Sequence, residues 1–321
     1  MAVIVTGGTG FIGSCLIRML NDRGISEIYV VDEVGSTEMW KHLVNKKYIE
    51  YIRKDQLFEK LSSLRGKISH VLHMGACSAT TERNFDYLYQ NNVEYTKKLW
   101  EFCVEENISF IYASSAATYG DGTHGFDDKQ DIAILEPLNG YGYSKQLVDL
   151  WAREQTTAPK QHVGLKFFNV YGPNEDCKDD MASVVYKSFY QILEKESVRL
   201  FRSHRPEYED GGQLRDFIYV KDICNVISFL MDHPEINGLF NLGTGKARSF
   251  ADLVKATFAA MEKPEQIEFV DMPEHLRGKY QYFTQAKMEK LIEAGYDKPF
   301  YSLEEGVRDY VQNYLSKNAV Y

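Results

Sequence analysis

Short apolar runs alternate with amphipathic segments through the first half of the chain. The runs occupy residues 2–6, 28–32, 48–52, 69–75, 108–114 and 163–169. Between them, residues 12–23, 55–65, 82–106 and 143–155 place apolar side chains at spacings of three and four, as helices do. Strands that alternate with helices in this way are typical of a parallel sheet covered by helices on both faces. We therefore predict an α/β fold built on a Rossmann-like, doubly wound parallel sheet.

The pattern changes after Pro173. Longer polar loops, such as RPEYEDGGQL at 205–214, separate helix-like runs at 181–195, 221–233, 249–261 and 302–316. The run GLFNLGTG at 238–245 has the character of a buried strand and indicates a return to the first sheet. We predict a Rossmann domain at 1–170, to which 216–247 return, and a smaller C-terminal α/β substrate domain at 171–321.

Composition narrows the classes of protein. A chain of 321 residues with 44% hydrophobic residues can bury a large core. No apolar run approaches the roughly 18 residues of a membrane span, and no basic leader precedes the first run, so we expect a cytoplasmic protein without membrane contacts. A net charge of -9 without a long basic run argues against nucleic acid as the partner. The five cysteines are scattered and lack a C-x-x-C pair, so we expect no disulfide framework and no metal site.

The sequence TGGTGFIG at 6–13 follows the first apolar run and opens the first helix. Its glycines fit the dinucleotide fingerprint in two registers, Gly8-x-Gly10-x-x-Gly13 and Gly7-x-x-Gly10-x-x-Gly13. Glycine is required because the turn is tight and the backbone must approach a pyrophosphate, which binds the free amides at the helix start. Asp32 ends the second run about twenty residues later, where a carboxylate can hold the adenosine ribose. Together these features predict a nicotinamide dinucleotide site.

The choice between the two nicotinamide dinucleotides stays open at this point. Asp32 and Glu33 would repel the 2'-phosphate of NADP, whereas Arg53 and Lys54, at the end of the third run, could attract it.

The stretch GYGYSK at 140–145 places two phenols just before one ammonium group. Side chains four apart share a helix face, so the spacing pairs Tyr141 with Lys145 and leaves Tyr143 as a packing residue. A free phenol has a pKa of about 10, so only about 0.1% of it is phenolate at neutral pH. Lowering the pKa to about 7 takes roughly 4 kcal/mol, which a neighbouring ammonium and a positively charged nicotinamide can supply in a dry cleft. Ser114 and Ser115 end the fifth run, where a hydroxyl can bond the same substrate oxygen as the phenol.

Three motifs, TGGTGFIG, YASSAATYG at 112–120 and the Tyr141-x-x-x-Lys145 pair, make the chain resemble the extended short-chain dehydrogenase/reductase family. Further stretches look like the nucleotide-sugar epimerases of that family that act on ADP-heptoses. They are HMGACSATTE (73–82), FNVYGPNE (168–175), MASVVYK (181–187), RDFIYVKD (215–222), FNLGTGKARSF (240–250) and GKYQYFTQA (278–286).

The resemblance implies an isomerase that inverts C6 of the heptose of ADP-D-glycero-D-manno-heptose. Hydride would leave C6, a transient 6-keto sugar would turn in the site, and hydride would return to the opposite face. The product would serve lipopolysaccharide core synthesis. The resemblance further implies NADP as the cofactor, with NAD as the alternative, an ADP-sugar as the small-molecule partner, and a homo-oligomer, a pentamer by analogy.

The resemblance also implies roles for individual residues. Lys178, in the loop after the NVYGP run, joins Tyr141, Lys145 and Ser115 as a catalytic residue. Cofactor binding falls to Gly7, Gly10, Phe11, Ile12, Gly13, Asp32, Glu33, Lys54, Met74, Gly75, Ala76, Cys77, Ser78, Asn91, Lys145 and Val170. Substrate binding falls to Asn169, Lys187, Phe201, Arg215 and Tyr280.

Other interpretations remain open. A C4-epimerase or reductase acting on another nucleotide sugar shares these motifs, because they specify hydride chemistry better than they specify a carbon atom. A 4,6-dehydratase would need an Asp-Glu pair where this chain has Ala116 and Ala117. A nucleotide-sensing binding protein could dispense with Tyr141 and Lys145, yet both are present. Met39 stands where the resemblance leads us to expect a lysine, which weakens the case for NADP.

Overall fold

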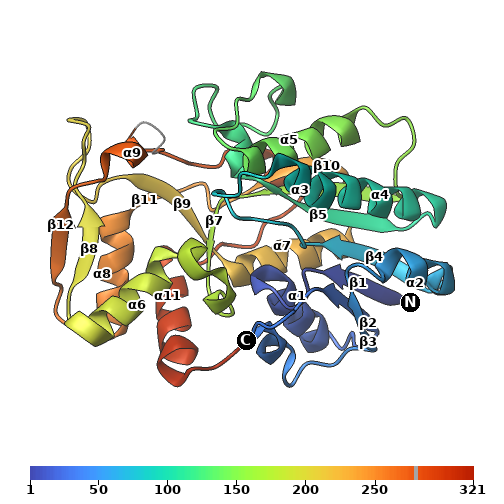
Figure 1. Ribbon diagram of the computed structural model, residues 1–321, viewed down its shortest axis with the longest axis horizontal. Coiled ribbons are helices and arrows are strands. Elements are labelled where there is room, and N and C mark those ends of the chain that lie inside the picture. Colours follow the sequence, from blue (N-terminus) through green and yellow to red (C-terminus); the bar gives the residue numbers. More distant parts are fainter. Residues whose placement is uncertain (278–280) are drawn as a thin grey trace.

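The computed structural model describes residues 1–277 and 281–321 (Figure 1). A central sheet of seven parallel strands has the order β10 (Gly238–Leu242), β6 (Gln161–Phe167), β5 (Ser109–Ser115), β4 (Ile68–His73), β1 (Ala2–Thr6), β2 (Ile28–Asp32) and β3 (Glu50–Arg53). From β1 the chain builds the sheet first toward β3 and then, through β4, toward β10, so the order reverses beside β1. The predicted α/β fold with a Rossmann-like parallel sheet is confirmed.

Helices cover both faces of this sheet, because successive side chains of each strand point to opposite faces. Val3 and Val5 of β1 pack in one core cluster with α1 (Phe11–Asp22) and α7 (Val220–Asp232). Ala2 and Ile4 pack in a second cluster with α2 (Leu57–Leu64), α4 (Tyr95–Glu105) and α5 (Gly140–Arg153). Strands buried on both faces explain why the sequence shows continuous apolar runs there rather than an alternating pattern.

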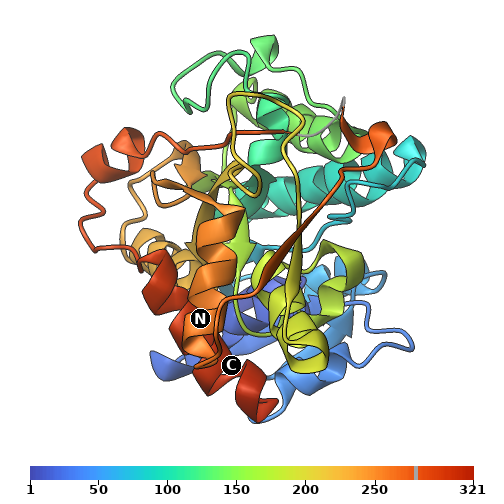
Figure 2. The same cartoon turned by 90° about the vertical axis from the view of Figure 1, so that its left-hand side faces the viewer.

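A smaller region lies next to the carboxyl ends of the strands of the central sheet (Figures 1 and 2). It contains a sheet with the order β11 (Ala247–Ser249), β9 (Leu214–Tyr219) and β7 (Asn169–Tyr171), and a pair of strands, β12 (Ile267–Val270) and β8 (Val198–Phe201). Helix α8 (Phe250–Ala260) packs against both α6 (Val184–Lys195) and α11 (Leu303–Asn313). The domain division near residue 170 stays a prediction, although β10 pairs with β6 of the central sheet along its whole length.

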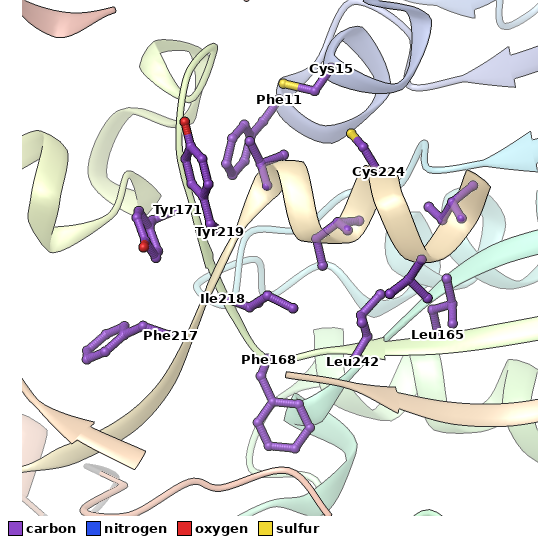
Figure 3. Packing of buried hydrophobic residues seen from close by; sticks show 14 of the residues in the cluster. Phe11, Cys15, Leu165, Phe168, Tyr171, Phe217, Ile218, Tyr219, Cys224 and Leu242 are labelled. Carbon is purple, nitrogen blue, oxygen red and sulfur yellow. The ribbon is translucent and has the colours of Figure 1, made fainter. Parts of the chain in front are cut away.

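The smaller region shares a hydrophobic core with the central sheet. Tyr171 of β7 and Tyr219 of β9 lie with their ring centroids 5.3 Å apart, and both belong to the same cluster as Phe11 of α1. Figure 3 shows these rings next to α7, which carries Cys224. This shared packing fixes β7, and the loop that follows it, against the glycine-rich start of α1.

The structure differs from the sequence prediction in several segments. The helix predicted at 82–106 begins as α3 (Phe85–Leu88), widens into a π-helical turn, η2 (Tyr89–Glu94), and continues as α4. Strands β8, β9 and β12 were not predicted as strands. β8 and β12 have only four residues each, and two side chains of β8 and all four of β12 are exposed or intermediate.

Short helical elements complete the described chain. They are η1 (Met39–Leu43), η3 (Ala116–Tyr119), η4 (Ile132–Ile134), η5 (Asp176–Met181), α9 (Glu274–Arg277), α10 (Glu289–Glu293) and η6 (Leu315–Lys317). Among the helices of residues 1–277 and 281–321, we find none with the length and apolar character to cross a membrane.

Candidate active site

The glycine-rich turn joins β1 to α1. Gly7 has a φ of 64°, and a Cβ atom there would lie 2.7 Å from the backbone of Gly75. The amide of Gly10 donates to the carbonyl of Gly7 at 3.0 Å, and Gly10 then caps α1 without a side-chain hydrogen bond. The first turn of α1 also carries no acidic side chain. A tight backbone turn, a helix start and the absence of a competing carboxylate make this geometry suitable for a pyrophosphate.

A pocket opens beside this turn, at the carboxyl ends of β1, β2 and β4. Its lining includes the predicted cofactor residues Gly7, Asp32, Glu33, Lys54, Gly75, Ala76, Cys77 and Asn91. It also includes Thr6, Val31, His73, Tyr87 and Tyr95, which we did not predict. Tyr87 and Tyr95 flank Asn91 at four-residue spacing, and that regular spacing was a signal in the sequence that could have identified both rings. Aromatic rings in such a pocket suit a planar base.

The other predicted cofactor residues lie outside this lining. Gly10 belongs to the turn itself, and Ile12 and Gly13 follow in the first turn of α1. Phe11 is 5% exposed and packs in the core, so only its backbone can face a ligand. Met74 and Ser78 flank the pocket residues 75–77, and Val170 lies on β7.

Asp32 is already held by the protein. Its Oδ2 accepts hydrogen bonds from the amide and the hydroxyl of Thr9, at 2.9 and 2.6 Å, and its Oδ1 accepts one from the amide of Glu33. The Glu33 carboxylate is paired with Lys54 at 2.6 Å. Burial opposes the charge on Lys54, but the bond to Glu33 and the nearby acids raise its pKa above the ordinary value. Of the two cations that could attract a 2'-phosphate, Lys54 is therefore paired with Glu33, and Arg53 is paired with Asp55 at 2.7 Å.

His73 lies beneath the pocket as a neutral ring. Its Nε2 donates to Thr96 Oγ1, because that hydroxyl donates in turn to the carbonyl of Asn92. Its Nδ1 accepts from Thr6 Oγ1 at 2.6 Å, and Thr6 Oγ1 accepts from the amide of Gly75. Burial lowers the pKa of His73 to about 3, in agreement with this pattern of donors and acceptors. The chain of bonds fixes the backbone of Gly75 at the pocket wall.

Asn92 holds the next part of the same wall. Its Oδ1 accepts from the amide of Cys77 at 2.9 Å, and its Nδ2 donates to the carbonyl of Cys77 at 3.0 Å. The same Nδ2 donates to Ser144 Oγ, which donates to the carbonyl of Tyr141. Asn92 is fully buried and was not predicted. It connects the loop of residues 74–78, which we call the cofactor loop, to α5, the helix that carries Tyr141.

Tyr141 and Lys145 both lie on α5, as their spacing predicted, because α5 begins at Gly140 with Asn139 as its cap. Burial raises the pKa of Tyr141, while a hydrogen bond with Ser115 lowers it in part. Lys145 is 3% exposed and donates to the carbonyl of Ala113 at 2.8 Å. Burial is thus the main influence on the phenol pKa, and Lys145 bonds the backbone of Ala113; the lowering expected from Lys145 together with a nicotinamide stays a prediction.

Ser114 and Ser115, at the end of β5, have different hydrogen-bond partners. Ser115 faces Tyr141, whereas Ser114 donates to Asp149 Oδ2 at 2.7 Å in a fully buried network. Lys166 also donates to Asp149 Oδ2, at 2.9 Å, and both side chains of this ion pair are at most 1% exposed. Because Asp149 lies one helical turn after Lys145, the network fixes the central part of α5 against β5 and β6. Tyr143 is 45% exposed and stacks on Phe85, away from Tyr141.

Lys178 reaches the site from η5. Its Nζ donates to Ser78 Oγ at 2.8 Å, and burial lowers its pKa. Its charge also contributes to lowering the pKa of Lys145, which burial brings to about 8. The loop is supported by buried Glu175, which accepts from the amide and the hydroxyl of Ser183. The structure therefore brings Lys178 to the cofactor loop, and Ser78 serves as its partner.

The predicted substrate residues lie on separate elements of the smaller region. Asn169 is exposed on β7, Lys187 lies on α6 and Phe201 ends β8. Arg215 of β9 donates to the carbonyls of Leu214 and Gln281, and its guanidinium lies over the ring of Phe250. Tyr280 lies outside the described residues. Within the described part of the chain, no three or more His, Cys, Asp or Glu side chains are grouped to hold a metal ion.

Comparisons with known proteins point in one direction. The profile of the family described as NAD dependent epimerase/dehydratase matches residues 3–243. ADP-L-glycero-D-manno-heptose-6-epimerase of Nitratidesulfovibrio vulgaris is 53% identical over 316 residues, 98% of each chain. The enzyme of that name from Fusobacterium nucleatum is 49% identical over 330 residues, 99% of each chain. Among solved structures, ADP-L-glycero-D-manno-heptose-6-epimerase of Helicobacter pylori matches with a TM-score of 0.83 at 27% identity, covering 97% of this chain and 95% of its own.

Proposed function

Because the chain belongs to the NAD dependent epimerase/dehydratase family, we propose that it inverts C6 of the heptose of ADP-D-glycero-D-manno-heptose. The observation that supports the proposal is that β5, α5 and η5 each bring one candidate catalytic side chain toward the loop of residues 74–78. Tyr141 and Ser115 meet at the carboxyl end of β5, while Lys178 reaches Ser78 from η5. Two groups able to move a proton therefore enter one site from different parts of the fold.

The described residues fit a nicotinamide dinucleotide. The close approach of Gly7 to Gly75 leaves no room for a side chain, and α1 presents its first turn beyond β1. Asp32 ends β2 at the rim of the pocket. When bound, the dinucleotide supplies a hydride acceptor and donor, so the sugar undergoes no net oxidation.

Tyr141 is proposed to exchange the proton on the oxygen of C6. When hydride leaves C6, the C6 hydroxyl loses its proton to the phenolate; when hydride returns to the other face, the ketone oxygen gains a proton. Ser115 would orient that oxygen through its hydroxyl, and the positive charge of Lys145, one helical turn along α5, would favour the phenolate form. The raised pKa of Tyr141 means that this stabilisation has to come from the bound cofactor as well as from Lys145.

Lys178 is proposed as the second acid/base, which acts when the ketone presents its other face. As an ammonium, Lys178 would donate the proton that the ketone oxygen needs when hydride returns, and its lowered pKa favours release of that proton; in the reverse direction the neutral amine would accept it. An amine on the far side of the turned ketone can then exchange the proton that Tyr141 no longer reaches. Lys187 and Arg215 are proposed to bind the diphosphate, because both offer cationic donors on the smaller region.

We propose NAD as the better of the two cofactors, although the resemblance implied NADP first. Glu33 pairs with Lys54, and Asp32 stands beside Glu33, so two carboxylates oppose a 2'-phosphate while the nearby cation is already neutralised. The description of the family, which names NAD, supports the same choice.

Three further elements of the proposal rest on resemblance. The product is proposed to enter lipopolysaccharide core synthesis in the cytoplasm, as the substrate of the relatives' named reaction suggests. The chain is proposed to form a homo-oligomer, a pentamer by analogy, which light scattering on the purified protein can test directly.

Incubation of the purified protein with ADP-D-glycero-D-manno-heptose tests the proposed reaction. Proton NMR should show the C6 epimer at equilibrium, without net change in nicotinamide absorbance. Denaturing the protein should release a dinucleotide that chromatography identifies as NAD. If the heptose stays unchanged while a UDP-hexose is converted, the alternative, a C4-epimerase or reductase on another nucleotide sugar, holds instead.

A further inference from the structure

His42 is a buried side chain that joins two functional loops. It lies in η1, and its side chain is only 1% exposed. Its Nδ1 lies 2.7 Å from the carbonyl oxygen of Thr9, in the glycine-rich turn. Its Nε2 lies 2.8 Å from Oδ1 of Asp176, two residues before Lys178. One imidazole thus spans the gap between the dinucleotide turn and the loop of the second candidate acid/base.

The partners of His42 determine how its ring is protonated. A carbonyl oxygen only accepts hydrogen bonds, so Nδ1 carries a proton toward Thr9. The hydrogen bond from His42 lowers the pKa of Asp176, so that carboxylate is ionised and also only accepts. Nε2 faces this acceptor, and the ring therefore bridges the two loops through both of its nitrogens.

Thr9 continues the connection to the cofactor pocket. Its amide and hydroxyl both donate to Asp32 Oδ2, and Thr9 is fully buried. A line of hydrogen bonds therefore runs from Asp32 through Thr9 and His42 to Asp176. Each bond in the line joins side chains or backbone groups that are far apart in the sequence, so the line fixes a tertiary arrangement rather than a local turn.

Other contacts hold the earlier part of the same loop. Asn174 donates to Ser14 Oγ at 2.9 Å, and Cys15 Sγ lies 3.5 Å from the carbonyl oxygen of Pro173. These contacts dock residues 173–174 on α1, and a hydrogen bond involving the Phe11 backbone reaches Cys177. The bond between His42 and Asp176 adds a further contact to this loop, through a charged side chain two residues before Lys178.

We infer that His42 is a positioning residue, which sets the loop of Lys178 at a fixed place relative to the dinucleotide turn. The inference rests on the proposed acid/base role of Lys178. Proton transfer needs donor and acceptor within hydrogen-bond reach, so a loop displaced by about 1 Å slows turnover even when every catalytic side chain is present. His42 touches neither sugar nor nicotinamide in this account, and it acts through Asp176.

Variants of both partners test the inference through epimerisation kinetics. His42→Ala and Asp176→Ala should each lower kcat about tenfold with little change in KM. Asp176→Asn should retain kcat within about twofold, because its amide N–H can donate to Nε2 of a neutral imidazole while Nδ1 still donates to Thr9. A higher kcat in Asp176→Asn than in Asp176→Ala would show that turnover depends on the hydrogen bond between His42 and residue 176, and not on the carboxylate charge.

The double variant provides the second readout. If His42 and Asp176 act as one unit, His42→Ala/Asp176→Ala should be no slower than the slower single variant. Asp232→Ala serves as the matched control, because Asp232 is 57% exposed, close to the 56% of Asp176, and pairs with Arg23 far from the site. Its kcat should equal that of the unmodified protein, and melting temperatures should be recorded for every variant.

The outcomes separate this inference from the proposed function. Unchanged kcat in both His42→Ala and Asp176→Ala would overturn the positioning role. Equal losses in Asp176→Asn and Asp176→Ala would do the same, because the bridge survives only in the asparagine variant. Full activity of Lys178→Ala would instead refute the proposed second acid/base, whatever the bridge variants show.

Discussion

Asn92 bonds both backbone groups of Cys77, as a neighbouring strand would, although the two residues are fifteen positions apart. The pairing keeps the cofactor loop extended where the pocket needs its backbone. Because Asn92 also bonds Ser144, a change in the loop is transmitted to α5, the helix of Tyr141.

We predict that Asn92→Ala weakens dinucleotide binding more than tenfold. The variant leaves the amide and carbonyl of Cys77 without their partners in a partly buried place, where each lost partner costs up to about 1–3 kcal/mol. Isothermal titration with NAD would measure the loss. Asn313→Ala, at an exposed asparagine that ends α11, is the control and should bind NAD normally. Equal affinity in both variants would show that the loop holds its shape without Asn92.

The hydroxyl of Ser115 should set the pH range of activity. Its hydrogen bond lowers the pKa of Tyr141, so Ser115→Ala should raise that pKa and move the acidic limb of the kcat profile to higher pH. Ser114→Ala, whose hydroxyl faces Asp149 instead, should lower the melting temperature without moving the limb. Tyr141→Phe should lose about 10²–10⁴-fold in kcat at every pH. A profile in Ser115→Ala that coincides with the unmodified protein would contradict the assignment.

Glu33 should govern the choice between NAD and NADP. Replacing it by glutamine removes one carboxylate and frees Lys54 from its ion pair, so a 2'-phosphate gains a cation. We expect NADP to bind about tenfold more tightly to Glu33→Gln, while NAD affinity changes little because Asp32 is retained. Fluorescence titration of both reduced dinucleotides would measure this. Lys54→Met should reverse the gain in the double variant; a gain that persists there would exclude Lys54 as its source.

Asp222 should make the protein less stable as the pH rises through the weakly acidic range. Burial raises its pKa to about 7, its Oδ1 lacks a hydrogen-bond partner among the described residues, and its Oδ2 accepts from the amide of Tyr301. The folded state holds this proton more tightly than the unfolded state. Stability from the protonated form is therefore present in full below pH 4 and is lost as the pH approaches and passes 7.

The asparagine of the Asp222→Asn variant cannot ionise. The difference in free energy of unfolding, variant minus unmodified protein, should therefore rise between pH 4 and 8, by at most about 4 kcal/mol. Urea denaturation at several pH values would measure the difference. Asp232→Asn, at an exposed site, should show no such trend. A constant difference across the pH range would rule out ionisation of Asp222 as the cause.

The sequence predicted those parts of the fold and site that depend on local patterns. Continuous apolar runs identified the strands of the central sheet, because both faces are buried, and the four-residue spacing placed Tyr141 and Lys145 on one helix. The glycine turn was predictable because its backbone conformation restricts the residue type. These features depend on neighbours within one helical turn or one strand.

The remainder depends on contacts between distant segments. No local pattern distinguishes Ser115 from Ser114, since their roles are set by Asp149 on the one side and Tyr141 on the other. Lys145 was expected to face the phenol, but the carbonyl of Ala113, on a neighbouring strand, is its partner. His42 and Asp176 lie 134 positions apart, so only the tertiary structure reveals their bond.

The π-helical turn at Tyr89–Glu94 limits where residues can be inserted into or deleted from this chain. Asn91 lines the pocket and bonds Lys54, while Asn92 bonds Cys77, so two adjacent amides hold different parts of the pocket lining. Loss or gain of one residue in the turn would rotate everything after it by about 100°, the angle of a single helical step. Homologous chains should therefore vary freely in residue type on the outer side of this helix, yet keep its length constant.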